Sequence, residues 1–177
     1  MTGSSPSTRN GWLLFGSVAL LTLLADQLSK WWARATLPVD DYGNGLAVSV
    51  VSNIWDWRLA YNKGSAFSMF GEVSGGRIIL TVVGFLAVAI ILYMAKNTET
   101  RSGLWSLGLV LGGTIGNLID RVSMGQVTDF VLWRYYDKEW PIFNVADIAL
   151  CIGIGVLLVA IFRVPASDAS AGPARTS

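Results

Sequence analysis

Histidine is absent from all 177 residues, and this absence excludes most familiar hydrolytic devices. Ser-His-Asp and Cys-His systems need an imidazole, and most catalytic zinc sites use one as a ligand. A hydrolase built from this chain must therefore use Asp, Glu, Lys, Ser, Tyr or Arg. We accordingly expect neither a metal centre nor a cofactor.

Cysteine is nearly absent as well, because Cys151 is the single one and it lies within an apolar run. One cysteine excludes an internal disulfide, and a thiol in such surroundings is expected to pack as a small hydrophobic side chain. The net charge is only +1, so charge indicates neither nucleic acid nor a strongly acidic partner.

Charged residues are scarce throughout the chain. They make up 14% of it, against 53% for hydrophobic residues, whereas soluble proteins carry about 25% charged residues. The mean hydropathy is +0.51. Several apolar runs approach the length of about 20 residues that a helix needs to cross the hydrocarbon core of a bilayer. The composition therefore predicts an integral membrane protein, mainly α-helical.

The predicted membrane domain covers residues 11–163 as a single unit. The segments 1–10 and 164–177 are small and polar, and we expect them to be disordered cytoplasmic tails. Four transmembrane helices are predicted at about 11–32, 77–95, 102–120 and 143–162.

The first apolar run has a second interpretation, a cleaved secretory signal, because it follows a short cationic start. No small-residue cleavage site precedes Asp26, so we favour an uncleaved helix. Asp26 and Lys30 are four residues apart in the acid-then-base order that favours pairing on one helix face. A plain ion pair near the membrane interface is the simple interpretation of these two residues.

The polar sections between the predicted helices have different patterns. Residues 33–76 carry β-branched and aromatic side chains in partial alternation, which predicts two to four short strands. Asn62, Lys63 and Gly64 then form a turn signal, whose simple interpretation is a hairpin turn. Residues 130–140, in the second section, are predicted to form an amphipathic segment at the membrane interface.

Lysine and arginine do not decide the orientation in the membrane. The tails and the short turn at 96–101 carry five of the thirteen cations, and the two longer sections with their helix margins carry the other eight. This count opposes the positive-inside rule for cytoplasmic termini. However, the short turn concentrates two cations in six residues, and several of the eight have acidic neighbours. We therefore favour cytoplasmic termini.

Three aspartates, Asp120, Asp129 and Asp147, stand in or beside apolar segments, where a carboxylate is costly. Two aspartates that share a proton are the best hydrolytic device left to this chain: one activates water while the other hydrogen-bonds the scissile carbonyl. Asp129 and Asp147 have no adjacent cation, whereas Asp120 precedes Arg121. The sequence thus favours Asp129 and Asp147 as the pair, and predicts that Asp120 and Arg121 form a structural ion pair or anchor a lipid headgroup.

Asn117 and Asn144 each precede an aspartate by three residues, so they are candidates for orienting the carboxylates or the substrate. Other interpretations of this polar set stay open. It would equally serve as polar contacts between helices, with Asn144 capping the last helix and Asp147 near its N-terminus. It would also serve as the proton or cation path of a small transporter or channel. A Ser-Lys dyad using Lys30 is a further alternative.

Five segments, in order and suitably spaced, resemble the motif set of the lipoprotein signal peptidase family (signal peptidase II), the aspartyl proteases of bacterial inner membranes. The resemblance covers residues 11–163, and its strength lies in the joint occurrence of the motifs. The segments are residues 26–30, 62–67, 112–121, 127–130 and 143–147.

The resemblance implies four transmembrane helices with cytoplasmic termini, a small periplasmic β-cradle in the first polar section and a periplasmic helix in the second. It implies cleavage of diacylglyceryl-modified prolipoproteins before the lipidated cysteine, near the periplasmic face. We expect a monomer that contacts membrane lipids. By motif, Asp129 and Asp147 are the implied catalytic pair. The implied supporting residues are Asn62, Gly64, Asn117, Arg121, Asn144, Asp26 and Lys30.

Overall fold

The computed structural model describes residues 8–64 and 76–162. The predicted C-terminal tail, most of the N-terminal tail and residues 65–67 of the 62–67 motif lie outside these ranges. Residues 8–10 were expected to be part of the N-terminal tail, but the first helix already begins at Thr8.

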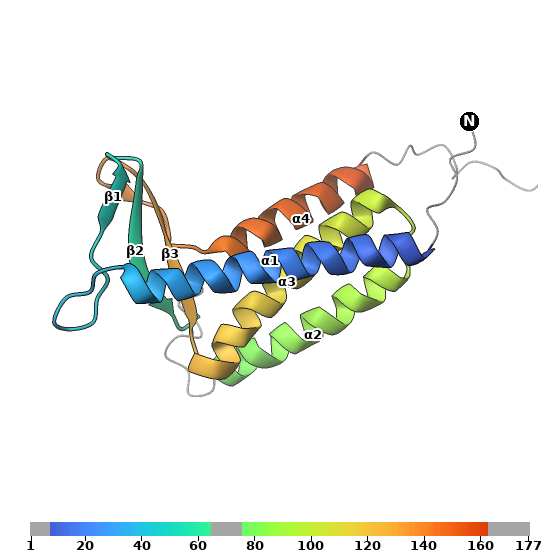
Figure 1. Ribbon diagram of the computed structural model, residues 1–177, viewed down its shortest axis with the longest axis horizontal. Helices are drawn as coiled ribbons and strands as arrows, with labels where there is room; N and C mark the ends of the chain where they lie inside the picture. Colours follow the sequence, from blue (N-terminus) through green and yellow to red (C-terminus); the bar gives the residue numbers. More distant parts are fainter. Residues whose placement is uncertain (1–7, 65–75, 163–177) are drawn as a thin grey trace, which may run out of the picture.

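Four helices lie side by side along the long axis of the molecule (Figure 1). Helices α1 (Thr8–Thr36), α2 (Gly76–Lys96) and α3 (Arg101–Met124) are long and apolar enough to cross a membrane, and α4 (Val145–Phe162) is apolar but shorter. All four predicted spans are therefore helices. The third extends past residue 120 because its end is set by Gly125, whose φ of 76° suits glycine.

Helix α3 packs against each of the other three helices. Its glycines allow this close approach, as the sequence predicted. A Cβ at Gly108 would lie 2.9 Å from the backbone oxygen of Phe15 in α1. Gly112 and Gly116 continue the same face one and two turns further on, against Ala19 and Asp26. The backbones of α1 and α3 can therefore lie in contact along the bundle.

Gly116→Ala is expected to destabilise the protein by about 1–3 kcal/mol, as overpacking of a well-packed core does. The added methyl group would collide with the carboxylate of Asp26, which lies in the helix interface. Gly155→Ala is the matched control because a Cβ there meets nothing within 4 Å. Thermal unfolding in detergent checks the prediction, and equal melting temperatures for the two variants would contradict it.

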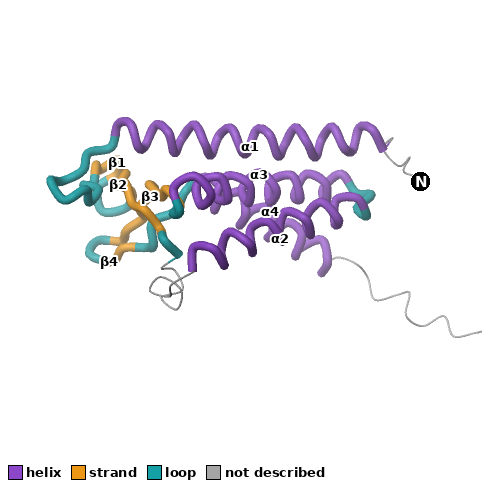
Figure 2. The backbone as a smooth tube through the Cα atoms, turned by 90° about the horizontal axis from the view of Figure 1, so that it is seen from below, coloured by secondary structure: helices purple, strands orange, loops and turns teal. Residues whose placement is uncertain are grey.

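A four-stranded antiparallel sheet lies across one end of the bundle (Figure 1, Figure 2). Its strands are β1 (Val48–Val51), β2 (Trp55–Asn62), β3 (Val127–Tyr135) and β4 (Lys138–Glu139), in that spatial order. The first polar section thus forms two strands, within the predicted number.

The prediction for the second polar section is wrong, because residues 130–140 are not helical. Trp133 of β3 pairs with Trp55 of β2, and the chain turns back at Tyr136, whose φ is 54°. The alternating aromatic and β-branched residues of this section favour a strand once a partner strand is available. Neither an amphipathic helix nor a periplasmic helix exists among the described residues of this section.

The sheet meets the helices near Asp129, and the strand register fixes the position of this residue. Asp129 pairs with Ala60 after a bulge that follows Trp57 in β2. Phe130 and Val131 then pack in a core beneath the sheet, together with Leu59 of β2 and Ala33 of α1. This core fixes β3, and with it Asp129, against the end of the bundle.

Candidate active site

The N-terminus of α4 carries the first part of the candidate site. The Asn144 side chain accepts a hydrogen bond from the Asp147 backbone N–H (3.0 Å), and the Asp147 carboxylate accepts one from the Asn144 N–H (3.1 Å). These reciprocal bonds cap the helix, because they satisfy donors that have no partner inside it. The predicted capping role of Asn144 is therefore confirmed.

Asn144 also reaches the second carboxylate. Its Nδ2 donates to Oδ1 of Asp129 at 2.7 Å and to Oδ1 of Asn117 at 3.1 Å, and the side chain is fully buried. Asp129 comes from β3 and Asp147 from α4, yet both bind the same asparagine. The structure thus brings together the two aspartates that the sequence favoured as a pair.

The surroundings of Asp129 favour its protonated form. This residue lies in β3, outside the membrane-spanning helices, and is 3% exposed. Burial raises the pKa of its carboxyl group to about 7, and the negative charge of Asp147 acts in the same direction. Hydrogen bonds from Asn144 and Asn62 and the charge of Lys30 lower this pKa in part. Asp129 therefore keeps its proton to a higher pH than an ordinary aspartate does.

Asn117 of α3 connects the pair to the interior of the bundle. Its Nδ2 donates to Oδ1 of Asp147 at 2.9 Å, and its Oδ1 accepts from Nζ of Lys30 at 2.9 Å. The orienting role predicted for Asn117 is thus directed at Asp147 of the neighbouring helix. Because both ends of the amide are engaged, Asn117 cannot rotate without breaking one of these bonds.

Asp26 and Lys30 form the predicted ion pair, with Nζ 2.8 Å from Oδ2. Both side chains are fully buried. Asp26 also accepts a hydrogen bond from the backbone N–H of Ala146 at 2.9 Å, in the first turn of α4. The pair therefore holds α4 against α1 beside the two aspartates.

The predicted pairing of Asp120 with Arg121 is wrong. Asp120 is 1% exposed and faces α1, where it lies 3.5 Å from Nζ of Lys30 and 3.6 Å from Nη1 of Arg34. Neighbouring residues on a helix point in different directions, so Arg121 does not share this face. Asp120 is buried in the protein and is thus also unsuited to anchoring a lipid headgroup.

Arg34 and Thr128 are two residues that the sequence prediction missed. Asp120 accepts a hydrogen bond from the Thr128 backbone N–H at 2.9 Å, and Nη1 of Arg34 donates to the Thr128 hydroxyl at 2.9 Å. These contacts fix the residue next to Asp129. One signal was available, because Arg34 follows Lys30 by four residues and so lies on the same helix face.

The remaining supporting residues lie around the pair. Arg121 is within electrostatic reach of Asp147 and Asp129, and its Nη1 donates to the backbone oxygen of Asn117 at 3.4 Å. Asn62, at the end of β2, hydrogen-bonds Asp129 and accepts from the Gly64 N–H at 2.8 Å. Gly64 has a φ of 101°, which only glycine adopts readily. The predicted turn is thus confirmed over residues 62–64.

The contacts also decide between two kinds of dyad. The described partners of the Lys30 ammonium are the carboxylates of Asp26 and Asp120 and the Asn117 amide, with no serine hydroxyl among them. A Ser-Lys dyad would need that hydroxyl within hydrogen-bond reach of the lysine. The geometry therefore favours the aspartate pair.

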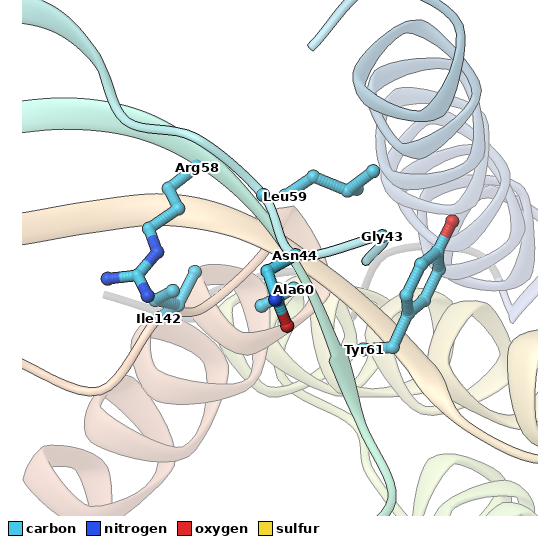
Figure 3. Close-up of a pocket in the computed structure, with 8 residues that line it drawn as sticks. Gly43, Asn44, Arg58, Leu59, Ala60, Tyr61 and Ile142 are labelled. Carbon is cyan, nitrogen blue, oxygen red and sulfur yellow. The ribbon is translucent and has the colours of Figure 1, made fainter. Parts of the chain in front are cut away.

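A small cavity of about 260 Å³ lies beside β2. Figure 3 shows Asn44 and Ala60 between the side chains of Arg58 and Tyr61. The lining contains none of the predicted site residues. One of its lining residues, Ala60, is the strand partner of Asp129.

A helical membrane protein that holds two aspartates on one buried asparagine, without histidine, fits the class of membrane aspartic peptidases. The comparison with protein families agrees with this class. The family model described as "Signal peptidase (SPase) II" matches residues 18–163. The chain belongs to this family of aspartic peptidases, and the resemblance seen in the motifs is confirmed.

Individual relatives give the same result. The lipoprotein signal peptidase of Janthinobacterium sp. (strain Marseille) is 41% identical over 152 residues, which cover 85% of this chain and 87% of the relative. That of Polynucleobacter necessarius subsp. necessarius (strain STIR1) is 37% identical over 148 residues, or 82% and 87% of the two chains. A solved structure described as a bacterial membrane enzyme shares the fold, with a TM-score of 0.75, 23% identity and coverage of 93% of this chain and 100% of that one.

Proposed function

We propose that this protein removes the signal peptide from prolipoproteins that carry a diacylglyceryl group, cleaving before the lipidated cysteine. The observation that carries this function is the bonding of Asp129 and Asp147 to one buried asparagine. Relatives named lipoprotein signal peptidase, matched over most of both chains, support the substrate class.

In this proposal all four helices cross the bacterial inner membrane. Helix α4, with 18 residues, spans about 27 Å at 1.5 Å per residue, close to the thickness of the hydrocarbon core. Because four crossings are an even number, both termini lie on the same side of the membrane, which we assign to the cytoplasm. The sheet and the aspartate pair then lie at the periplasmic face, and the enzyme acts as a monomer.

The two aspartates take different roles in the reaction. The Asp147 carboxyl group accepts hydrogen bonds from the Asn117 side chain and the Asn144 backbone, which orient it. It removes a proton from the attacking water. Asp129 has a pKa raised to about 7, so it keeps its proton to a higher pH than an ordinary aspartate does. It donates a hydrogen bond to the scissile carbonyl oxygen, where negative charge develops.

Supporting residues hold this arrangement or meet the substrate. Asn117 and Asn144 orient the two carboxylates, and the buried pair of Asp26 and Lys30 fixes the first turn of α4. Arg121 contacts the substrate backbone beside the pair. Asn62 and Gly64 form a turn at the end of β2 on which the peptide is positioned.

The pH dependence of kcat/KM follows from the proton on Asp129. With a pKa of about 7, Asp129 loses that proton as the pH rises, so activity should fall about tenfold per pH unit above pH 7. A pH series from 5 to about 9 with purified enzyme checks this expectation. Constant activity across the alkaline half of the series would exclude Asp129 as the acid.

The lipid on the substrate provides the test of the proposed function. A purified prolipoprotein with its diacylglyceryl group should be cleaved by the detergent-solubilised protein, and the same polypeptide without that group should be cleaved poorly. Equal rates for the two substrates would contradict the proposal. Proton or cation flux in proteoliposomes without any proteolysis would favour the transporter interpretation instead.

A further inference from the structure

An apolar groove of about 730 Å³ lies where α1, the start of α4 and the sheet meet. Its volume is within the range of small-molecule and lipid sites, about 300–1,000 Å³. The aromatic wall comes from the sheet and the opposite wall from the helices. The lining includes Trp55, Trp57, Trp133, Leu28, Ser29 and Ile148.

The chemistry of the groove excludes a charged ligand part. Among the described residues that line it, no side chain is charged, and the one hydroxyl group, that of Ser29, already donates to the backbone oxygen of Asp26 at 2.9 Å. Trp55 and Trp57 are in ring contact, with centroids 4.7 Å apart. The Trp55 indole N–H is buried without a hydrogen-bond partner among the described residues, so the side chains of this wall are held by ring packing and their backbones by strand pairing.

The groove differs from the aspartate site in its helix partners. Asp147 turns toward Asn117 of α3, whereas the groove is closed by α1, with Val145 and Ile148 as the residues of α4 that face it. Groove and site therefore lie on different faces of α4. A ligand in the groove would not occupy the position of the scissile bond.

The lipid-facing surface of the bundle leads directly into this groove. On α1, Leu21 and Leu28 are 66% and 63% exposed, and Leu28 is part of the groove. On α4, Ile148 and Ile152 are exposed in the same way, and Ile148 lines the groove. Figure 1 shows the strands crossing the end of the bundle, beyond the start of α4. A lipid beside α1 and α4 would thus meet the aromatic face of the sheet, at the depth where Trp side chains are favoured.

We propose that an acyl chain of a glycerophospholipid from the surrounding bilayer occupies this groove and holds the sheet against α1 and α4. Asp129 belongs to the sheet and Asp147 to α4, so the bound lipid stabilises the relative position of the two carboxylates. Lipid binding itself is independent of the reaction. Its effect on activity rests on the proposed peptidase function.

The test uses the full-length protein stripped of lipid in detergent and dioleoylphosphatidylglycerol as the probe. Added probe should raise the melting temperature of the wild type by about 5 °C, as a ligand specific to the folded state does. Ser29→Phe fills the groove and should lose most of this rise and most of the phospholipid retained in native mass spectrometry. Leu21→Phe, on the same helix but outside the groove, should behave as the wild type.

Two results would overturn the proposal. One is an unchanged lipid response in Ser29→Phe. The other is an increase in KM for the lipidated substrate in that variant while the phospholipid response stays normal, which would assign the groove to the substrate's own lipid. If Ser29→Phe does not fold, Trp133→Ala removes the half-exposed wall instead and should likewise lose the response. Because melting temperature and lipid retention need no catalysis, failure of this proposal is distinguishable from failure of the peptidase function.

Discussion

Replacing Asp129 or Asp147 by asparagine is expected to reduce kcat for prolipoprotein cleavage by about 10³–10⁴-fold, the contribution of a positioned acid or base. Asparagine keeps the shape of the side chain but neither takes a proton from water nor gives one up. Because the two residues act as one unit, the double variant should lose little more than either single variant. Quantifying the released signal peptide with purified protein measures the effect.

The matched control for these variants is Asp56→Asn. Asp56 is another buried carboxylate of the sheet, 1% exposed, but its partner is Arg134, with Nε 3.2 Å from Oδ2. This variant should keep cleavage within a few-fold of the wild type. Similar losses in Asp56→Asn and Asp129→Asn would mean that burial of a carboxylate, and not the pair, explains the effect.

The pH dependence of the folding stability is a second, independent test of the raised pKa of Asp129. Its pKa is raised on folding, so the folded state binds more protons than the unfolded state between pH 4 and about 7. Stability from this group is therefore present at low pH and is lost as the pH rises through about 7. Asp129→Asn removes this loss, so the inactive variant should be at least as stable as the wild type in alkaline buffer.

The second large effect is expected for Lys30→Met, which should destabilise the protein by about 3–5 kcal/mol. The Lys30 ammonium is fully buried between the carboxylates of Asp26 and Asp120, and its removal leaves buried negative charge without compensation. Asp120 keeps Arg34 nearby, whereas Asp26 loses its cationic partner. Cleavage should fall as well, because Asn117 loses the hydrogen bond that fixes it toward Asp147.

A double variant separates the charge effect from the loss of packing. Asp26→Asn combined with Lys30→Met removes both members of the pair, and it should melt at a higher temperature than Lys30→Met alone. Thermal unfolding of the single and double variants measures this coupling. A double variant that is no more stable than Lys30→Met would show that the ion pair is not what the lysine provides.

The helices and the aspartate pair could be predicted from the sequence for clear physical reasons. Apolar runs of membrane-crossing length leave few alternatives to helices. The lack of histidine restricts hydrolysis to carboxylates, and Arg121 next to Asp120 separated that aspartate from the other two. The sequence thus favoured Asp129 and Asp147, which the structure brings together on Asn144. The cation next to Asp120 is not its partner, because Asp120 pairs with Lys30 and Arg34.

The contacts that depend on three-dimensional packing could not be predicted. Asp120 finds Lys30 and Arg34 on α1, a choice set by which face of α3 meets α1 and not by sequence neighbours. Residues 130–140 have aromatic residues that suit either an interfacial helix or a strand. Pairing with β2 decides for the strand, and β2 lies more than 60 residues earlier in the chain.

The most direct test of the account is mass spectrometry of the products after one lipidated prolipoprotein is incubated with the wild type, Asp129→Asn and Asp147→Asn. The wild type should form a mature chain that begins with the lipidated cysteine, and both variants should leave the substrate uncleaved, with all three proteins folded. The same product formed at the wild-type rate by either variant would contradict the central claim that Asp129 and Asp147 together carry out the cleavage.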